Sequence, residues 1–297
     1  MPGDEEIRSA PTMEERVVST LSRIDQDLPT IPLVLSRIMH LSASDETSIN
    51  DIIEVLNQDQ VLTTRILKVA NSAYYSPREK VTTIGRAVVT LGFDMIQALA
   101  VSVSFIQHFS PTSRCEGFEL GLFWAHTIAV GAFSEILARQ WGSIDPGDAF
   151  TAGILHDIGK LVMLIYFEEE FKQVLKKAAD EKIDFFEAEM SQLGVSHAFV
   201  ASLLLRHWNI PEVLVGAIEN HHQLLVPEDD LRLTACVNFA DFAAKYIPIG
   251  KSGSQYFNPP SLELLRRTGY SVAKFKAYLQ EMKDRQDEVY ALISALD

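Results

Sequence analysis

Two adjacent ionisable residues, His156 and Asp157, lie inside an apolar run over residues 151–165. Such a run is expected to be buried, and burying an imidazole and a carboxylate without partners is costly or forces them to become neutral. A divalent metal ion is the simplest partner, because it binds the Asp carboxylate and an imidazole nitrogen at once. The pair therefore predicts a metal site.

Further metal-binding side chains occur in other apolar segments, in the order His126, His197, His221, His222 and Asp241. Taken alone, each of them could be an ordinary core residue, and Asp241 could simply pair with Lys245 four positions later. The coincidence of five histidines and two acids favours at least one bound metal ion. Mixed His and Asp ligation suits Fe, Mn, Co, Ni or Zn, so we expect one or two divalent transition-metal ions.

The other candidate ligands are interpreted as ordinary structural residues. His40, His108 and His207 are expected to be core or helix-end side chains. Cys115 and Cys236 lie far apart without Cys-x-x-Cys spacing, which is typical of buried thiols in a reducing compartment.

Helical periodicity runs through most of the chain and predicts the elements that position these residues. Apolar residues recur at three- and four-residue steps over 31–41, 49–56 and 61–70, and no stretch shows sustained alternation, so the fold class is all-α. His126 and His156 are 30 residues apart, enough for two antiparallel helices joined by a sharp turn over 142–147. His197 is expected in a helix's first turn, and His221 and His222 at the end of a helix over 211–220.

Turn-forming residues divide the chain into four expected parts. Residues 1–14 are interpreted as a flexible tail, 15–112 as an N-terminal helical subdomain, and 113–250 as a metal-binding helical subdomain. Residues 251–297 are expected to form a loop and C-terminal helices that pack on the core. Residues 249–260, rich in Gly, Ser and Pro, are a candidate flexible loop.

Composition limits the classes of function. With 47% hydrophobic and 22% charged residues, the 297-residue chain is typical of a globular protein rather than a disordered one. The net charge of -14 argues against a general nucleic-acid binder, which needs a basic surface. The N-terminus lacks the pattern of a signal peptide, and the longest apolar run, 91–106, is too short and polar to span a bilayer. We therefore expect a cytoplasmic protein that binds neither membrane nor nucleic acid.

The order His, His-Asp, His, Asp resembles the metal-binding pattern of the HD superfamily of metal-dependent phosphohydrolases. Segments 28–32, 59–74 and 83–92 narrow the resemblance to the HDOD family, bacterial signalling modules related to those hydrolases. Ala-Asn-Ser-Ala over 70–73 and the segment 87–92 are its most specific parts. The resemblance covers residues 28–241 and implies a multi-helix HD-like bundle with an N-terminal helical subdomain.

The resemblance also implies roles for individual residues. His126, His156, Asp157 and Asp241 match the four core metal ligands, and His197, His221 and His222 match the additional ligands of two-metal members. Asp157 would bridge the two ions. Lys160 would lie near a substrate phosphate, although it could instead form a salt bridge to Asp157. His222 or His197 could protonate a leaving oxygen.

Two departures from the cyclic-dinucleotide phosphodiesterase branch are visible. No Gly-Tyr-Pro follows the His156-Asp157 pair, and Leu122 replaces a carboxylate found in three-metal members. Hydrolysis of cyclic di-GMP is therefore not expected.

Two functions remain open. The first is a bacterial regulatory module that retains an HD-type mono- or dinuclear metal site and acts through protein partners in a signalling pathway. The second is a metal-dependent phosphohydrolase or phosphodiesterase acting on a small phosphoester or nucleotide. A basic and aromatic stretch over 265–279 is either a solvated helix face or a docking site for an acidic partner.

Overall fold

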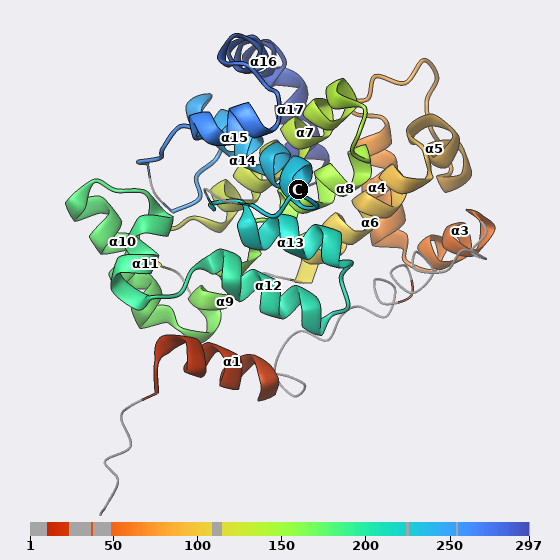
Figure 1. The fold of residues 1–297 in the computed structure, drawn as a ribbon. Helices are drawn as coiled ribbons and strands as arrows, with labels where there is room; N and C mark the ends of the chain where they lie inside the picture. The colour runs from red at the N-terminus through yellow and green to blue at the C-terminus, as the bar shows by residue number, and fades with distance from the viewer. Residues whose placement is uncertain are drawn as a thin grey trace, which may run out of the picture.

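The computed structural model describes residues 11–23, 37, 49–108, 115–223, 226–253 and 255–296. Within these ranges the regular structure is helical (Figure 1), apart from an isolated bridge between Cys115 and Phe118. The all-α prediction is confirmed. His40, residues 1–10 and 28–32, and most of the predicted helix over 31–41 lie outside the described residues.

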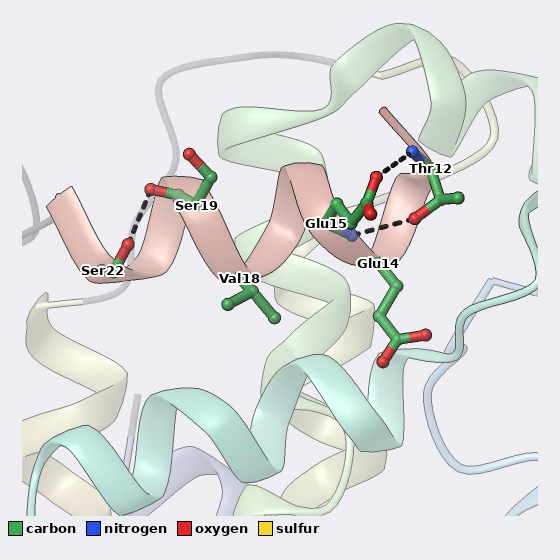
Figure 2. A pocket seen from close by; sticks show the side chains of 6 residues that line it. All are labelled: Thr12, Glu14, Glu15, Val18, Ser19 and Ser22. Atoms are coloured by element: carbon green, nitrogen blue, oxygen red, sulfur yellow. Dashed lines mark hydrogen bonds between the residues drawn. The ribbon is translucent and has the colours of Figure 1, made fainter. Parts of the chain in front are cut away.

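The front of the chain begins with α1 (Met13–Arg23). Thr12 and Glu15 form a reciprocal cap, in which the Thr12 N–H donates to Glu15 Oε2 at 2.8 Å and the Glu15 N–H donates to Thr12 Oγ1 at 3.2 Å. Val17 and Leu21 are buried, and α1 packs against α12 (Figure 1). Figure 2 shows a pocket along α1 that is lined by Thr12, Glu14, Glu15, Val18, Ser19 and Ser22.

The described part of the front section also contains four further helices: α3 (Ile49–Asn57), α4 (Gln60–Ala70), α5 (Ile84–Leu91) and α6 (Phe93–His108). Asp59 caps α4 and Thr83 caps α5, each by accepting backbone N–H groups of the first turn. Asn71 closes the connection between these two helices, because its side chain bonds the carbonyl groups of Leu67 and Val81 at 2.7 Å.

The centre of the molecule is a helical hairpin, α7 (Leu120–Trp141) and α8 (Pro146–Leu155). Asp145 accepts the Gly147 N–H at 2.7 Å, and Pro146 occupies the first helical position. Gly131 and Gly153 let the two helices touch, since a Cβ on Gly153 would lie 2.7 Å from the Gly131 Cα. The predicted turn over 142–147 and the antiparallel pairing are confirmed.

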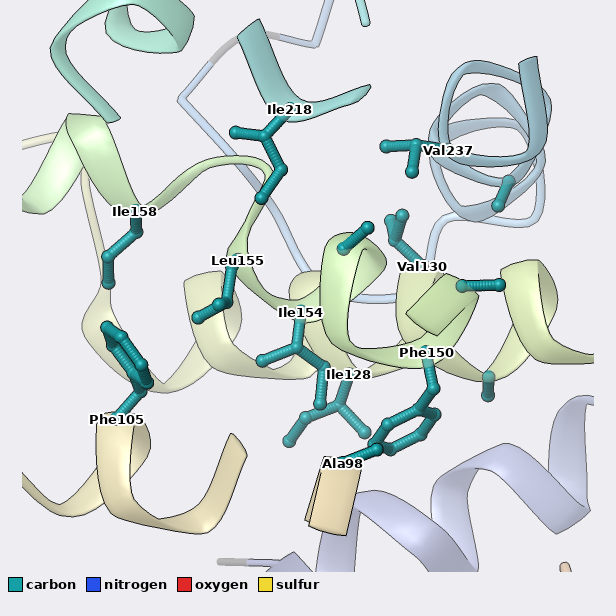
Figure 3. Packing of buried hydrophobic residues seen from close by; sticks show 14 of the residues in the cluster. Ala98, Phe105, Ile128, Val130, Phe150, Ile154, Leu155, Ile158, Ile218 and Val237 are labelled. Atoms are coloured by element: carbon teal, nitrogen blue, oxygen red, sulfur yellow. The ribbon is translucent and has the colours of Figure 1, made fainter. Parts of the chain in front are cut away.

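Six helices follow around this hairpin: α9 (Ile158–Tyr166), α10 (Glu168–Glu181), α11 (Phe185–Leu193), α12 (His197–His207), α13 (Glu212–Asn220) and α14 (Leu231–Tyr246). Almost every residue of α8 is buried. Figure 3 shows apolar side chains of α8 packed among residues of four other helices, including Ala98, Phe105, Ile128, Val130, Ile218 and Val237.

The chain ends in α15 (Leu262–Arg267), α16 (Val272–Asp284) and α17 (Gln286–Leu296). The Tyr278 hydroxyl donates to the Phe133 carbonyl of α7 at 3.2 Å, and Arg65 of α4 donates to the Leu296 carbonyl at 2.7 Å. These helices therefore join the front section to the central hairpin. The aromatic residues of the 265–279 stretch, Tyr270, Phe275 and Tyr278, are buried.

Two stretches, Leu120–Trp141 and Pro146–Tyr166, are long and apolar enough to cross a membrane by length and composition alone. The bent pair of Ile84–Leu91 and Phe93–Gln107, which contains the 91–106 run, also passes that test when taken together. In the most apolar window of the first two stretches, 78% and 89% of residues are buried inside the protein. Burial of these two stretches in the protein core explains their high mean hydropathy without a membrane.

Candidate metal centre

The fold brings all seven predicted metal ligands to one place. His126 lies on α7, His197 is the first residue of α12, and Asp241 lies on α14. The remaining four ligands sit where helices end: His156 and Asp157 in the break between α8 and α9, and His221 and His222 directly after α13. All are buried except His222, which is partly exposed.

Three of these residues, His126, His156 and Asp241, form a first group. Their ligand atoms all lie within 4.8 Å of one another. The Asp241 Oδ1 atom is 3.0 Å from His126 Nε2 and 3.7 Å from His156 Nε2. Two imidazoles and one carboxylate facing a common point form a donor set that suits a divalent transition metal.

A second group consists of Asp157, His197, His221 and His222, again with ligand atoms within 4.8 Å of one another. The Asp157 Oδ1 atom lies 3.0 Å from His197 Nε2. Its other oxygen, Oδ2, faces the first group, at 3.4 Å from His156 Nε2 and 4.0 Å from His126 Nε2. Asp157 therefore stands between the two groups with one oxygen toward each.

Six buried ligand atoms of the centre have no hydrogen-bond partner among the described residues. They are the Oδ1 atoms of Asp157 and Asp241 and the Nε2 atoms of His126, His156, His197 and His221. Each buried polar atom left unpaired costs about 1–3 kcal/mol. Six such atoms gathered in two neighbouring ligand groups fit metal coordination, so the residues present suit divalent ions.

Neighbouring groups fix the orientation of three imidazoles. The Nδ1 atom of His156 lies 2.7 Å from the Gly153 carbonyl, and that of His221 lies 2.6 Å from the Ile218 carbonyl. A carbonyl can only accept, so Nδ1 carries a hydrogen in both rings and Nε2 is the nitrogen available to a metal.

Glu189 on α11 fixes the orientation of the His197 imidazole in the same way. The sequence patterns did not predict this role for Glu189. Its Oε2 lies 2.6 Å from His197 Nδ1, and its Oε1 accepts the His197 backbone N–H at 3.1 Å. Both side chains are fully buried. The one available signal was a lone acid eight residues before His197 among the buried residues Phe185 and Ala188.

Two lysines compensate the acids of the centre. The Lys160 ammonium donates to Asp157 Oδ2 at 2.7 Å, and the Lys245 ammonium donates to Asp241 Oδ2 at 2.7 Å. Both pairings match the structural alternatives considered from sequence. Lys160 also donates to the Ser252 carbonyl at 2.9 Å and is 1% exposed.

These charges determine the protonation states. Burial strongly lowers the pKa of His221 and His222, so both imidazoles are neutral, as metal ligands must be. Burial favours the neutral acid in Asp157, but His156 and Lys160 hold the pKa of Asp157 well below its ordinary value. Burial also opposes charge on His156, yet Asp157 and Asp241 raise the pKa of His156 to about 9, so a metal ion that binds its Nε2 would displace a proton.

The remaining candidates lie apart from the centre. His207 is the last residue of α12 and belongs to neither ligand group. His108 ends α6. Cys115 and Cys236 are free and buried, as predicted, and burial raises the pKa of each thiol.

Comparison with known proteins gives a relative that matches most of the chain. An uncharacterized protein of Treponema pallidum (strain Nichols) is 26% identical over 281 residues, which is 92% of this chain. The chain spans 53% of that relative's length.

Solved structures resemble this fold over nearly the whole chain. An HDOD domain protein of unknown function from Geobacter sulfurreducens is 26% identical with a TM-score of 0.77, over 96% of this chain and 99% of that one. A predicted signal transduction protein of Marinobacter aquaeolei is 21% identical (TM-score 0.75; 98% and 62% covered). A predicted phosphohydrolase of Shewanella amazonensis is 23% identical (TM-score 0.70; 94% and 98% covered). These last two show a shared fold.

The family model of the HDOD domain matches residues 28–224, more than half of the chain. The match includes helices α3 to α6 of the front section and all of the candidate ligands except Asp241. The chain belongs to the HDOD family.

Proposed function

We propose that this chain is a bacterial regulatory module built around a dinuclear divalent-metal centre. The supporting observation is the set of buried, unpaired ligand atoms in two groups with Asp157 between them. His126, His156 and Asp241 would hold one ion, and His197, His221 and His222 would hold the other. Asp157 would bridge both, because a carboxylate between two cations reduces their repulsion.

The closed surroundings of the centre favour regulation over rapid turnover. Six of the seven ligands are at most 6% exposed, and only His222 reaches solvent in part. The helix that carries His126 also contacts α17, which packs on α4 of the front section. A change at the centre could therefore reach surfaces that bind protein partners. We place this activity in the cytoplasm, without nucleic-acid or membrane partners.

A metal-dependent phosphohydrolase acting on a small phosphoester or nucleotide is the second candidate. The ligand set and the fold shared with the predicted phosphohydrolase of Shewanella amazonensis support it. Bound divalent ions would polarise a phosphoryl oxygen and lower the pKa of water. Burial lowers the pKa of His222, which favours a ligand role for it over proton donation. Cyclic di-GMP remains an unexpected substrate, since no Gly-Tyr-Pro follows Asp157.

Elemental analysis of the purified protein tests the centre. We expect about one to two equivalents of transition metal in the wild type, and the loss of about one equivalent in His156→Ala, which removes a ligand of the first group. His207→Ala is the matched control, because His207 belongs to neither group. Absence of metal from the wild type after reconstitution with Fe, Mn, Co, Ni and Zn would contradict both candidate functions.

A further inference from the structure

Residues 248–253, which we call the strap, follow α14 and lie against the metal centre. Ile249 and Ser252 are buried. At the far end of the strap, a Cβ on Gly253 would lie 3.0 Å from the Phe185 ring. The strap thus runs from the helix that carries Asp241 to the start of α11.

Gly250 brings the strap onto the helical turn that carries His126. Its φ is +69°, and a Cβ there would overlap the backbone N of His126 and the carbonyl of Leu122. The next residue, Lys251, donates its backbone N–H to that same Leu122 carbonyl at 2.9 Å. Only glycine combines this backbone conformation with so close an approach.

The strap also occupies the Lys160 ammonium. This group has three donors: one goes to Asp157 Oδ2 at 2.7 Å, and one goes to the Ser252 carbonyl at 2.9 Å. The ammonium lies 4.9 Å from the centre of the Phe185 ring, which covers a further side. With these contacts and 1% exposure, Lys160 cannot reach a phosphate while the strap is in place.

We infer that the strap is an autoinhibitory gate, in which the Ser252 carbonyl holds the position on Lys160 that a ligand's phosphoryl oxygen would take. The inference rests on the proposed metal centre and specifies its ligand as a phosphoryl group. A phosphate dianion is a stronger acceptor than a neutral carbonyl, so a bound phosphoryl group displaces the strap. The displaced segment precedes α15, α16 and α17 in the chain.

Hydrogen exchange of the strap amides in the full-length, metal-loaded protein tests this gate. In the wild type, inorganic phosphate should accelerate exchange at Lys251, whose N–H is bonded only while the strap is closed. Gly250→Ala should exchange about tenfold faster without phosphate and bind phosphate about tenfold more tightly by calorimetry, because no closed strap competes. Its control is Gly142→Ala, which has a similar φ of +64° and no atom within 4 Å of the added Cβ.

Lys251→Pro is a second opening variant, in case Gly250→Ala does not fold. It removes the N–H bonded to Leu122 and leaves every side chain of the centre intact. It should bind phosphate more tightly than the wild type, as Gly250→Ala should.

The gate is overturned if phosphate leaves the exchange rate of the strap amides unchanged or slows it. It is also overturned if phosphate binds neither the wild type nor the opening variants. Binding of phenyl phosphate is compared with binding of inorganic phosphate. Tighter binding of phenyl phosphate identifies a phosphoester as the ligand, and tighter binding of inorganic phosphate identifies free phosphate. Either result supports the gate. Metal content of the same samples decides the metal centre separately, so failure of the gate and failure of the proposed function are distinguishable.

Discussion

Glu189 and His197 form a buried carboxylate–imidazole pair, with Glu189 Oε2 2.6 Å from His197 Nδ1. The carboxylate also accepts the His197 backbone N–H at 3.1 Å, so it fixes both the ring and the start of α12. An outer carboxylate of this kind orients a ligand and increases its basicity. In the proposed metal centre, Glu189 would therefore be a positioning residue.

Glu189→Gln should weaken metal binding by about 10- to 100-fold, the usual cost of losing such an outer partner. The amide keeps the shape of the side chain and removes its charge. Competition with a coloured chelator would measure the affinity. Glu187→Gln on the same helix is the control, since Glu187 contacts Asn258 outside the centre. An affinity equal to that of the wild type would remove Glu189 from the centre.

Loss of ligands from different groups should give different metal stoichiometries. His221→Ala removes a ligand of the second group only, and we expect the metal content to fall from about two equivalents to about one. Asp157→Asn removes the carboxylate that faces both groups, so both ions should be lost or greatly weakened. Elemental analysis after desalting distinguishes the two. Equal stoichiometry in both variants would argue against a bridging Asp157.

The contact between α7 and α8 should tolerate no added methyl group. A Cβ on Gly153 would lie 2.7 Å from the Gly131 Cα and 2.8 Å from the Val130 carbonyl, both rigid backbone. Gly153→Ala should lower the free energy of unfolding by about 1–3 kcal/mol or more. Gly121→Ala, at a helical site with no atom within 4 Å, should be neutral or slightly stabilising. Urea denaturation of both variants measures the difference.

Asp148 should make the protein less stable as the pH rises. Burial, together with Asp145 and Asp94, raises the pKa of Asp148 from 3.8 to about 6. Between these values the folded protein keeps a proton that the unfolded chain has released, so stability falls as pH rises through this window and stays reduced above it.

Asp148→Asn removes this titration and should stabilise the protein at pH 7 by about 1–2 kcal/mol, a value discounted for partial exposure, with no gain at pH 3.5 or below. Thermal unfolding at several pH values measures it. Asp287→Asn, in the exposed first turn of α17, is the control. A gain for Asp148→Asn that is constant with pH would show that titration is not its cause.

The metal ligands could be predicted from sequence because their polarity conflicts with their surroundings. His126 and Asp241 are isolated polar residues in apolar helices, and burial leaves them few alternatives to a metal. The helices themselves follow from apolar periodicity, and the 142–147 turn follows from its Gly, Asp and Pro residues.

The break at His156 and Asp157 could not be predicted, because the apolar run 151–165 has the same composition on both sides. Glu189 resembles any other acid of α11 until the packing places it beside His197. The strap acts through backbone atoms, above all the Ser252 carbonyl, and a backbone carbonyl leaves no trace in the sequence. The described residues within 249–260 do form a non-helical segment, but Ile249 and Ser252 are buried, and the backbone N–H groups of Ile249 and Lys251 are hydrogen-bonded.

The outermost ligands, His126 and Asp241, are 115 positions apart in the chain, and the full set comes from helices or helix ends that meet only in the folded protein. An unfolded chain therefore cannot assemble the proposed centre, and folding and metal uptake would form one linked equilibrium. Stability should increase with the logarithm of free metal concentration above the dissociation constant. In a cell, metal supply would then set how much of this protein survives proteolysis, independently of any ligand it senses.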